Sequence, residues 1–455
     1  RALISVSDKT GLIEFSRALI DLNIEIVSTG GTAMALRAAG IAVTEVSSIT
    51  GFPEIMDGRV KTLHPRIHGG LLGVLDNPDH ETARKEHDIV PIGLLVVNLY
   101  PFEKTVAGDP EWAEAIENID VGGPAMIRAG AKNHGDVTVI VDPADYGTIL
   151  AELKTRGSQT DVGTRRRLAA KAFARTAAYD SAISQWLVAE QGLGLAAGYF
   201  TTGGAVLQSL RYGENPHQEA ILVATPGGQH GITAVRQVQG KELSYNNIND
   251  TDAALECLAE FDAESEAACV IVKHANPCGV AVAATPLEAY QRALACDPVS
   301  AFGGIIAFNR ELDGPTAAEI AKLFTEVIVV PAVNGEGLAQ VSAKKNLRLL
   351  VLDRGSMSKK GFSVKSVAGG LLVQSMDSVS IRDMELRVVS KREPSLDELK
   401  DLKFAFQVAK HVKSNAIVYA KNGATVGIGA GQMSRVDSSR IAVAKARDSA
   451  GETTS

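Results

Sequence analysis

Short apolar runs alternate with helical repeats in the first part of the chain. The runs at 2–6 and 24–27 are predicted to be short strands. Between them, Leu12, Phe15 and Leu19 recur at the spacing that places side chains on one face of a helix. Because strands and helices alternate, the pattern predicts a parallel sheet covered by helices.

A turn of small residues, 28–32, follows the second run, and the run at 41–46 predicts the next strand. In parallel sheets, ligands bind beyond the carboxyl ends of the strands, and a helix N-terminus at that edge favours an anion. The turn has neither the sequence of a Walker A loop nor a dinucleotide-binding fingerprint. Two interpretations stay open for this segment: a site for a small phosphate group, or a tight turn between a strand and a helix.

Three further polar segments, 58–65, 96–102 and 119–134, lie at predicted strand ends or turns. A single segment of this kind is typical of a solvated surface. Several that converge on one sheet edge indicate a pocket for a phosphorylated, polar ligand.

A long helical pattern at 161–191 is followed by a segment, 192–204, that holds five glycines. A chain of 455 residues also exceeds what one hydrophobic core usually supports. We therefore predict a first domain over 1–191, a linker over 192–204 and a second domain over 205–455.

The second half contains one apolar run, 269–272, that ends on two functional side chains, Lys273 and His274. Histidine titrates near neutral pH and can take a proton from a nucleophile. Lysine can stabilise the oxygen anion that forms when a carbonyl is attacked. The pair therefore suits acyl or formyl transfer, and the alternative is an ordinary strand end with two solvated side chains.

Farther along, Asn422 and Gly423 lie between apolar runs and predict a two-residue hairpin turn. We find no tandem repeat of fixed period.

A zinc-dependent nucleobase deaminase requires H-x-E followed by P-C-x-x-C. Here His274 is followed two residues on by Asn276 instead of glutamate, and Cys278 is followed three residues on by Ala281 instead of cysteine. The four cysteines of the chain show no paired spacing for a metal. We therefore expect no catalytic metal.

The composition limits the choice of partners. The net charge of −7 argues against a general nucleic-acid binder, and no apolar run is long enough to span a membrane. Few cysteines fit a reducing cytoplasm, so a cytoplasmic location is expected. The chain starts at Arg1 and stops at Ser455 without a closing element, and both ends look trimmed.

The polar motifs occur in the order found in one enzyme family. The chain resembles the bifunctional purine-biosynthesis enzymes that join aminoimidazole-carboxamide ribotide (AICAR) transformylase to inosine monophosphate (IMP) cyclohydrolase. The motifs that carry this resemblance are spread over nearly the whole chain, at 5–11, 28–32, 58–65, 98–102, 119–123, 131–134, 210–218, 273–279, 413–415 and 427–432.

The resemblance implies an α/β fold with two parts. The N-terminal part would be a doubly wound domain of the methylglyoxal-synthase-like type. The C-terminal transformylase region would contain two subdomains that resemble cytidine deaminase without zinc. Members of the family form intertwined homodimers with transformylase sites between the chains. The family also continues past the position of Ser455, and that tail supplies part of the transformylase pocket.

The implied function is the last two steps of de novo purine nucleotide synthesis. The co-substrate 10-formyltetrahydrofolate would give its formyl group to AICAR, and dehydrative ring closure of formyl-AICAR would then yield IMP. Folate and these nucleotides are the expected small-molecule partners, with no nucleic acid and no membrane. A chain that truly ends at Ser455 would have a damaged formyl-transfer site, so the cyclohydrolase is the safer assignment.

The resemblance assigns roles to residues at both sites. In the cyclohydrolase, the nucleotide would be held by Ser7, Lys9, Thr29, Gly31, Thr32, Arg59 and Thr62. The reacting formyl and carboxamide groups would be surrounded by Lys61, Tyr100, Asp120 and Lys132. In the transformylase, His274 would be the general base, Lys273 would stabilise the oxyanion and Asn415 would orient the formyl group. The ribotide would be bound by Arg211, Tyr212, Glu326 and Arg435.

Two rival functions are compatible with parts of the pattern. A non-catalytic sensor of nucleotide monophosphates would bind the ribotide tightly and form no product. A metal-dependent deaminase would contain stoichiometric zinc, which the missing ligands argue against.

Overall fold

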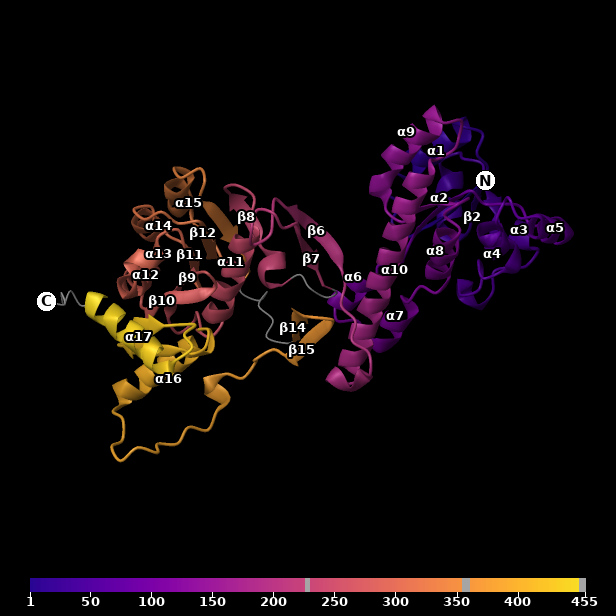
Figure 1. Ribbon diagram of the computed structural model, residues 1–455. Helices are drawn as coiled ribbons and strands as arrows, with labels where there is room; N and C mark the ends of the chain where they lie inside the picture. Colours follow the sequence, from indigo (N-terminus) through magenta and orange to yellow (C-terminus); the bar gives the residue numbers. More distant parts are fainter. Residues whose placement is uncertain (226–229, 354–360, 450–455) are drawn as a thin grey trace. The chain divides into compact units, whose positions relative to one another are not determined.

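The computed structural model describes residues 1–225, 230–353 and 361–449 (Figure 1). The chain divides into two compact units. The first comprises Arg1–Ala205 and a return segment that begins at Val223; the second takes Val206–Leu222 and the described residues from 230 onward. The glycine-rich segment 192–204 therefore falls in the first unit, where it carries the short helix η3 (Gly194–Ala197).

The first unit is built on a five-stranded sheet whose order is β3-β2-β1-β4-β5, and all its strands are parallel. In this order the chain runs outward to β3, returns to the middle and continues to β5. Ligands bind where the direction reverses, which here is the crevice between the carboxyl ends of β1 and β4. The strands are β1 (Ala2–Val6), β2 (Ile26–Ser28), β3 (Thr44–Glu45), β4 (Leu94–Asn98) and β5 (Thr138–Ile140).

Helices cover both faces of this sheet, because successive side chains of each strand point to opposite sides. In β1, Ile4 packs in a core with residues of α1 and α9, whereas Leu3 packs in another core with residues of α8 and α10. The predicted strand at 41–46 is only two residues long, since Val46 already begins a helix. The helices of this unit are α1 (Leu12–Asp21), α2 (Gly30–Ala38), α3 (Val46–Thr50), η1 (Met56–Gly58), α4 (Pro65–Leu72), α5 (Pro78–Glu86), α6 (Phe102–Ala107), α7 (Trp112–Glu117), α8 (Gly122–Lys132), η2 (Pro143–Asp145), α9 (Tyr146–Thr155) and α10 (Val162–Glu190).

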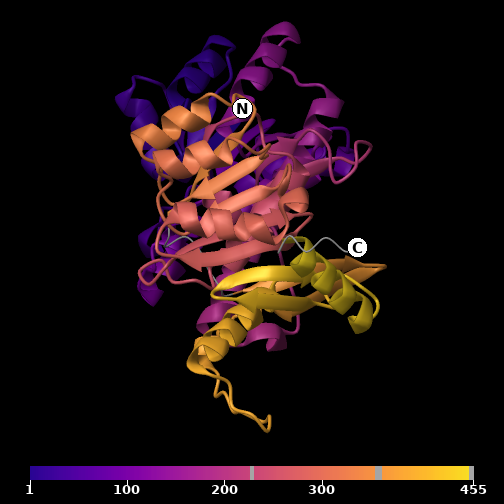
Figure 2. The ribbon, with the colours of Figure 1, turned by 90° about the vertical axis from the view of Figure 1, so that its left-hand side faces the viewer.

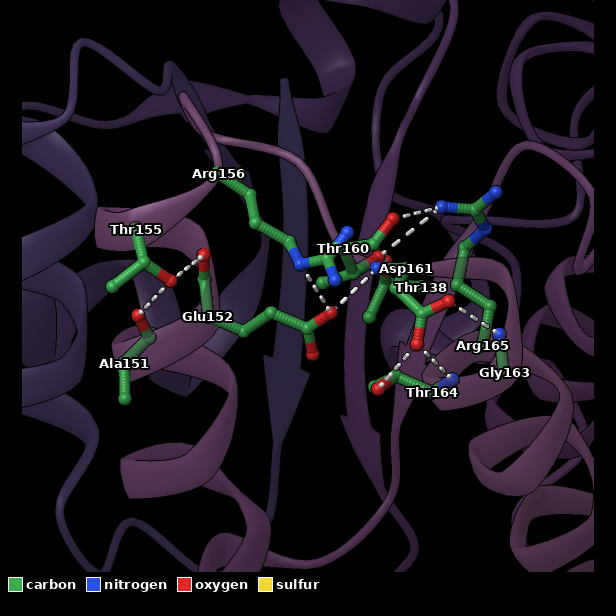
Figure 3. A network of polar contacts seen from close by, with 10 residues as sticks. All are labelled: Thr138, Ala151, Glu152, Thr155, Arg156, Thr160, Asp161, Gly163, Thr164 and Arg165. Carbon is green, nitrogen blue, oxygen red and sulfur yellow. Dashed lines mark hydrogen bonds and ion pairs between the residues drawn. The ribbon is translucent and has the colours of Figure 1, made fainter.

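A polar network holds the start of α10, the longest helix of this unit (Figure 3). The carboxylate of Asp161 caps the helix by accepting hydrogen bonds from the amides of Gly163 and Thr164, at 3.0 and 3.2 Å. The hydroxyls of Thr160 and Thr138 lie 2.6 Å apart and join the loop before the helix to β5. These contacts fix where α10 begins to cross the sheet.

The second unit contains an eight-stranded mixed sheet in the order β16-β17-β10-β9-β11-β12-β13-β8. Figure 2 shows these strands side by side with helices against them. Strand β9 is antiparallel to both neighbours, whereas β11, β12 and β13 are parallel to one another. The strands are β8 (Arg236–Gln239), β9 (Ala267–Lys273), β10 (Asn276–Ala283), β11 (Ile305–Phe308), β12 (Val327–Val330), β13 (Arg348–Val351), β16 (Ile417–Lys421) and β17 (Ala424–Gly429).

Two separate hairpins and several helices complete this part of the chain. The hairpins pair β6 (Ala205–Leu210) with β7 (Ala220–Ala224), and β14 (Phe362–Val367) with β15 (Gly370–Ser375). The helices are η4 (Gly231–Ala234), α11 (Tyr245–Leu258), α12 (Pro286–Cys296), α13 (Pro298–Ala301), α14 (Gly314–Ile320), α15 (Gly335–Ser342), η6 (Ile381–Asp383), α16 (Leu396–Lys410) and α17 (Arg435–Ser449). None of the helices in the described residues is long and apolar enough to cross a membrane.

A helix–strand–strand–helix motif occurs twice in the second unit. We call α11-β9-β10-α12 the first copy and α16-β16-β17-α17 the second copy. Both opening helices start with a serine capping box, at Ser244 and at Ser395. In the second strand of each copy, a Cβ on Gly279 or Gly427 would lie 2.0 or 2.1 Å from a carbonyl oxygen of the closing helix. Glycine is therefore required at both positions.

The two copies meet through β10 and β17, which are antiparallel. Sequence analysis found no tandem repeat, because the copies share a geometry and a few residues, and the spacing between matching residues varies. The predicted hairpin at Asn422 and Gly423 is confirmed as the turn between β16 and β17. In the first copy the corresponding turn is formed by His274 and Ala275, at φ values of 55° and 54°. A residue with a Cβ in this region costs on the order of 1–3 kcal/mol.

Candidate functional site

A cavity of about 480 Å³ opens at the crevice between β1 and β4 of the first unit. This volume lies in the range of small-molecule sites. Its walls come from the ends of β1 and β4, the starts of α2 and α8, and the loop around Arg59. All the residues predicted for the cyclohydrolase line it except Lys132: Ser7, Lys9, Thr29, Gly31, Thr32, Arg59, Lys61, Thr62, Tyr100 and Asp120.

Two helices present their N-termini to this cavity. Thr29 and Gly31 at the start of α2 line one side, and Gly122 and Gly123 at the start of α8 line another. Thr29, the N-cap residue of α2, makes no side-chain capping hydrogen bond. Helix N-terminal amides without such a cap attract anions, so the start of α2 is suited to a phosphate group.

The hydroxyl of Thr32 has a structural role in this wall. Its Oγ1 accepts a hydrogen bond from the amide of Val6 and donates one to the carbonyl of the same residue, both at 3.0 Å. This side chain therefore ties α2 to the end of β1 and keeps the 28–32 turn at the cavity.

Three cations lie at the cavity, and each is held by a neighbour. Arg59 forms an ion pair with Glu117, and Lys61 Nζ lies 3.3 Å from a carboxylate oxygen of Glu54. Lys9 Nζ donates to the carbonyl of Ser7 at 3.4 Å. The pair of Arg59 and Glu117 is exposed, and exposed ion pairs contribute little to stability, so an anionic ligand could displace it at low cost.

Asp120 lines the cavity two residues before the first residue of α8. Burial raises its pKa, while hydrogen bonds from the backbone of Gly123 and Tyr100 and the charge of Lys61 act in the opposite direction. Its Oδ1 accepts from the amide of Gly123 at 2.7 Å, and its own amide donates to the hydroxyl of Tyr179 at 2.8 Å. A rigidly held carboxyl group with a raised pKa is suited to carry a proton during catalysis.

Lys132 is the predicted residue that the structure does not bring to the cavity. It is the last residue of α8, whose first residues, Gly122 and Gly123, line the cavity. A helix rises 1.5 Å per residue, so Lys132 lies roughly 15 Å away along the axis. Its side chain is exposed. Its assigned role rests on the resemblance alone.

Asn98 is a cavity residue to which sequence analysis gave no role. Its Oδ1 accepts from the amides of Ser7 and Asp8 at 2.6 and 2.9 Å, and its Nδ2 donates to the carbonyl of Asp8 at 2.9 Å. Asn98 thereby holds the loop that carries Ser7 and Lys9. The sequence signal that could have identified this residue is an asparagine at the carboxyl end of an apolar strand.

A second group of predicted residues lies at one edge of the eight-stranded sheet. Lys273, the last residue of β9, is half-buried, and its Nζ donates to the carbonyls of Phe302 and Gly303 at 2.8 and 3.1 Å. His274 follows on the exposed turn. The solvated-strand-end interpretation thus fits His274 alone, because Lys273 has fixed partners.

The segment 413–415 lies beside this turn. Asn276 bridges the two, because its Nδ2 donates to the carbonyl of His274 at 3.2 Å and its Oδ1 accepts from the amide of Lys413 at 3.0 Å. Asn415 in turn donates to the carbonyls of residues 432 and 433, at 2.9 and 3.1 Å. The structure therefore brings His274 and the segment of Asn415 together.

The four residues predicted to bind the ribotide do not all lie at the His274 turn. The register of β9, β11 and β12 puts Glu326 at the same sheet edge as Lys273, and its carboxylate pairs with Arg348 at 2.7 Å. Arg435 begins α17, two residues beyond the carbonyl of Met433 to which Asn415 donates. Arg211 and Tyr212 contact each other, with the guanidinium 4.7 Å from the ring centre. No hydrogen bond within the described residues joins that pair to the His274 turn.

Cys278 belongs to the segment that matches half of the zinc deaminase motif. Burial raises the pKa of its thiol to about 12. Among the described residues, no group of three or more histidine, cysteine or acidic side chains is placed to hold a metal ion.

The structure is an α/β protein with one candidate site in each unit: a polar cavity at the switch point of the first sheet and a lysine–histidine turn in the second unit. The family model for the AICARFT/IMPCHase bienzyme matches residues 130–445, and that for the MGS-like domain matches residues 11–125. The chain therefore belongs to the AICARFT/IMPCHase family of purine biosynthesis. It is a bifunctional AICAR formyltransferase and IMP cyclohydrolase, as the resemblance implied.

Individual relatives agree with this assignment. The "Bifunctional purine biosynthesis protein PurH" of Bradyrhizobium diazoefficiens is 61% identical over 455 residues, which cover 99% of this chain and 85% of that protein. The protein of the same name from Parvibaculum lavamentivorans is 59% identical over 451 residues, covering 99% and 84%. A crystal structure of ForH is 33% identical and covers 40% of this chain and 94% of its own, at a TM-score of 0.37, too low for an argument about the fold.

Proposed function

We propose that the two units divide the two reactions of the family between them. The first unit closes the ring of formyl-AICAR to IMP, and the second transfers the formyl group of 10-formyltetrahydrofolate to AICAR. The observation that carries this proposal is the assembly of phosphate-binding turns, cations and Asp120 around one cavity of the first unit.

Ring closure requires the carboxamide nitrogen of formyl-AICAR to attack the formyl carbon and the former formyl oxygen to leave as water. The amide nitrogen is a poor nucleophile, so holding the two groups together provides much of the rate, on the order of 7–11 kcal/mol for well-oriented reactions. Lys61 and Tyr100 line the cavity with donors suited to the formyl oxygen. Asp120 takes a proton from the carboxamide nitrogen and passes it to the former formyl oxygen. The resulting hydroxyl leaves as water with the proton that the former 5-amino nitrogen loses as the ring C=N bond forms.

Formyl transfer forms a bond between the 5-amino nitrogen of AICAR and the formyl carbon, and it breaks the bond from that carbon to N10 of the folate. His274 accepts the proton that the amino group loses, and N10 receives a proton as it leaves. Lys273 stabilises the oxyanion of the intermediate. An ammonium group has three donors, and two of them are used by the carbonyls of Phe302 and Gly303, so one is left for the oxyanion.

The repeated motif of the second unit supports the finer description of its fold. Two copies of a helix–strand–strand–helix motif are consistent with two subdomains that resemble cytidine deaminase without zinc. We also propose the homodimer of the family, with transformylase sites between chains. A mass measurement in solution at several protein concentrations tests the dimer.

The two activities are measured separately in the intact protein. AICAR and 10-formyltetrahydrofolate should yield tetrahydrofolate and IMP, and formyl-AICAR alone should be cyclised. Asp120→Asn should reduce cyclisation about 10²-fold or more and let formyl-AICAR accumulate. Glu81→Gln, at an exposed residue of α5 that does not line the cavity, should change neither activity. Tight binding of both nucleotides without product would favour the non-catalytic sensor.

A further inference from the structure

The turn that carries His274 has an unusual sequence for its geometry. Residue pairing places Lys273 opposite Asn276, so His274 and Ala275 form a two-residue hairpin turn. Both have positive φ, 55° and 54°. Hairpin turns of this type favour Asn-Gly or similar pairs, because a Cβ is disfavoured at these angles. This turn therefore requires stabilising contacts from neighbouring residues to adopt the conformation.

These contacts are made by Asp250, a half-buried residue of α11. One of its carboxylate oxygens accepts a hydrogen bond from the amide of His274 at 3.1 Å, and the other accepts from the amide of Ala275 at 2.9 Å. Asn276 donates to the carbonyl of His274 at 3.2 Å. The backbone on which the imidazole is mounted is thus held at both its amide and its carbonyl.

The second copy of the motif has the same contact between an aspartate and a hairpin turn, but its turn contains no histidine. Asp401 lies at the sixth position of α16, as Asp250 does in α11. Its two oxygens accept from the amides of Asn422 and Gly423, each at 2.7 Å. There the turn is Asn-Gly, which adopts this conformation on its own. The first copy thus keeps the aspartate but holds a pair of residues that the turn itself does not favour.

We propose that Asp250 is a positioning residue for formyl transfer: its carboxylate fixes the left-handed turn and so sets the orientation of His274. This inference rests on the proposed role of His274 as the general base. Asp250 bonds backbone amides and not the imidazole, so it acts through geometry. Small displacements of a catalytic group reduce rates strongly, whereas substrate affinity, which depends on other residues, should change little.

The test compares four variants of the intact protein. Asp250→Asn keeps the size of the side chain but replaces one acceptor by a donor. We expect kcat of formyl transfer to fall about 30- to 100-fold, with KM for AICAR within about twofold. Asp401→Asn is the matched control in the second copy and should stay within about threefold, because Asn-Gly needs no support. Cyclisation of formyl-AICAR, which takes place in the other unit, should be unchanged in both variants and reports on folding.

A rescue separates positioning from other roles. Ala275→Gly removes the Cβ that disfavours the turn. In the double variant with Asp250→Asn, kcat of formyl transfer should therefore recover by about a third or more of the decrease in log kcat. An unrecovered loss, or equal losses for Asp250→Asn and Asp401→Asn, would overturn the positioning role. His274→Ala tests the proposed base separately from the positioning role. If this variant retains formyl transfer, His274 is not the base. If His274→Ala loses formyl transfer while Asp250→Asn stays fully active, only the positioning role of Asp250 is overturned.

Discussion

The two candidate sites of this protein are built by different means. The cavity of the first unit lies at the switch point of a parallel sheet, where two helix N-termini and several strand ends meet for topological reasons. The site of the second unit depends on one hairpin turn, whose His274 and Ala275 adopt a conformation that their side chains disfavour. A site of the first kind follows from the fold, while one of the second kind needs specific supporting contacts.

The largest effect is expected at the second site. Lys273→Met removes the cation proposed to stabilise the oxyanion and leaves the carbonyls of Phe302 and Gly303 without their donor. We expect formyl transfer to fall by about 10²–10³, measured as tetrahydrofolate release. Lys322→Met removes an exposed lysine of the same unit, paired with Glu319, and should change the rate by less than twofold. If both variants retained activity, the lysine–histidine turn would not be the formyl-transfer site.

The first site should respond to loss of its proton carrier. Asp120→Asn keeps the bond to the amide of Gly123 but removes the titrating group. Cyclisation should fall about 10²-fold or more, while formyl transfer continues. Product is followed as IMP formed from formyl-AICAR. An unimpaired rate would show that another group moves the proton.

A smaller effect is expected when Asp120 is only displaced. A Cβ at Gly123 would lie 2.6 Å from Asp120 Oδ2 and 2.7 Å from a methyl group of Leu99. Gly123→Ala should therefore reduce cyclisation about 10-fold or more. Gly147→Ala is the matched control, because no atom lies within 4 Å of its Cβ position. Similar rates for the two variants would mean that the carboxylate does not need its present position.

The resemblance and the geometry make opposite predictions for the role of Lys132 in cyclisation. The resemblance places it among the reacting groups, whereas the structure places it at the far end of α8. From the geometry of the single chain we expect Lys132→Ala to change cyclisation by less than about threefold. A loss of 100-fold with nucleotide binding intact would show that this side chain reaches a cavity, as in an assembled dimer.

The smallest effect concerns stability and pH. Burial raises the pKa of Asp120 in the folded protein, so the folded state holds the proton more tightly than the unfolded chain. The resulting contribution to stability is present at low pH and is lost as the pH rises through the folded pKa. Asp120→Asn should therefore raise Tm by on the order of 2 °C at pH 8, and by less at pH 5. A melting series across this range measures the trend, and a gain that is equal at both pH values would contradict it.

Much of this protein could be predicted from the order of its residues. Buried strands reveal themselves as continuous apolar runs, and the predicted sheet of the first unit formed with the polar segments at one edge, because parallel strands align their carboxyl ends. Lysine and histidine at the end of an apolar run were also recognisable, since no core would accept them there. Local chemistry of this kind is written in the chain and does not depend on distant partners.

Only the tertiary structure decided which distant groups support these residues. Asp250 and His274 lie far apart in the sequence and meet because α11 packs beside β9, and Lys132 lies away from the cavity because a helix carries it along its axis. The repeated motif was equally hidden, since two stretches of different sequence adopt one geometry. Hydrogen bonds between distant segments depend on how elements pack, and packing is a property of the whole fold, which periodicity along the chain does not record.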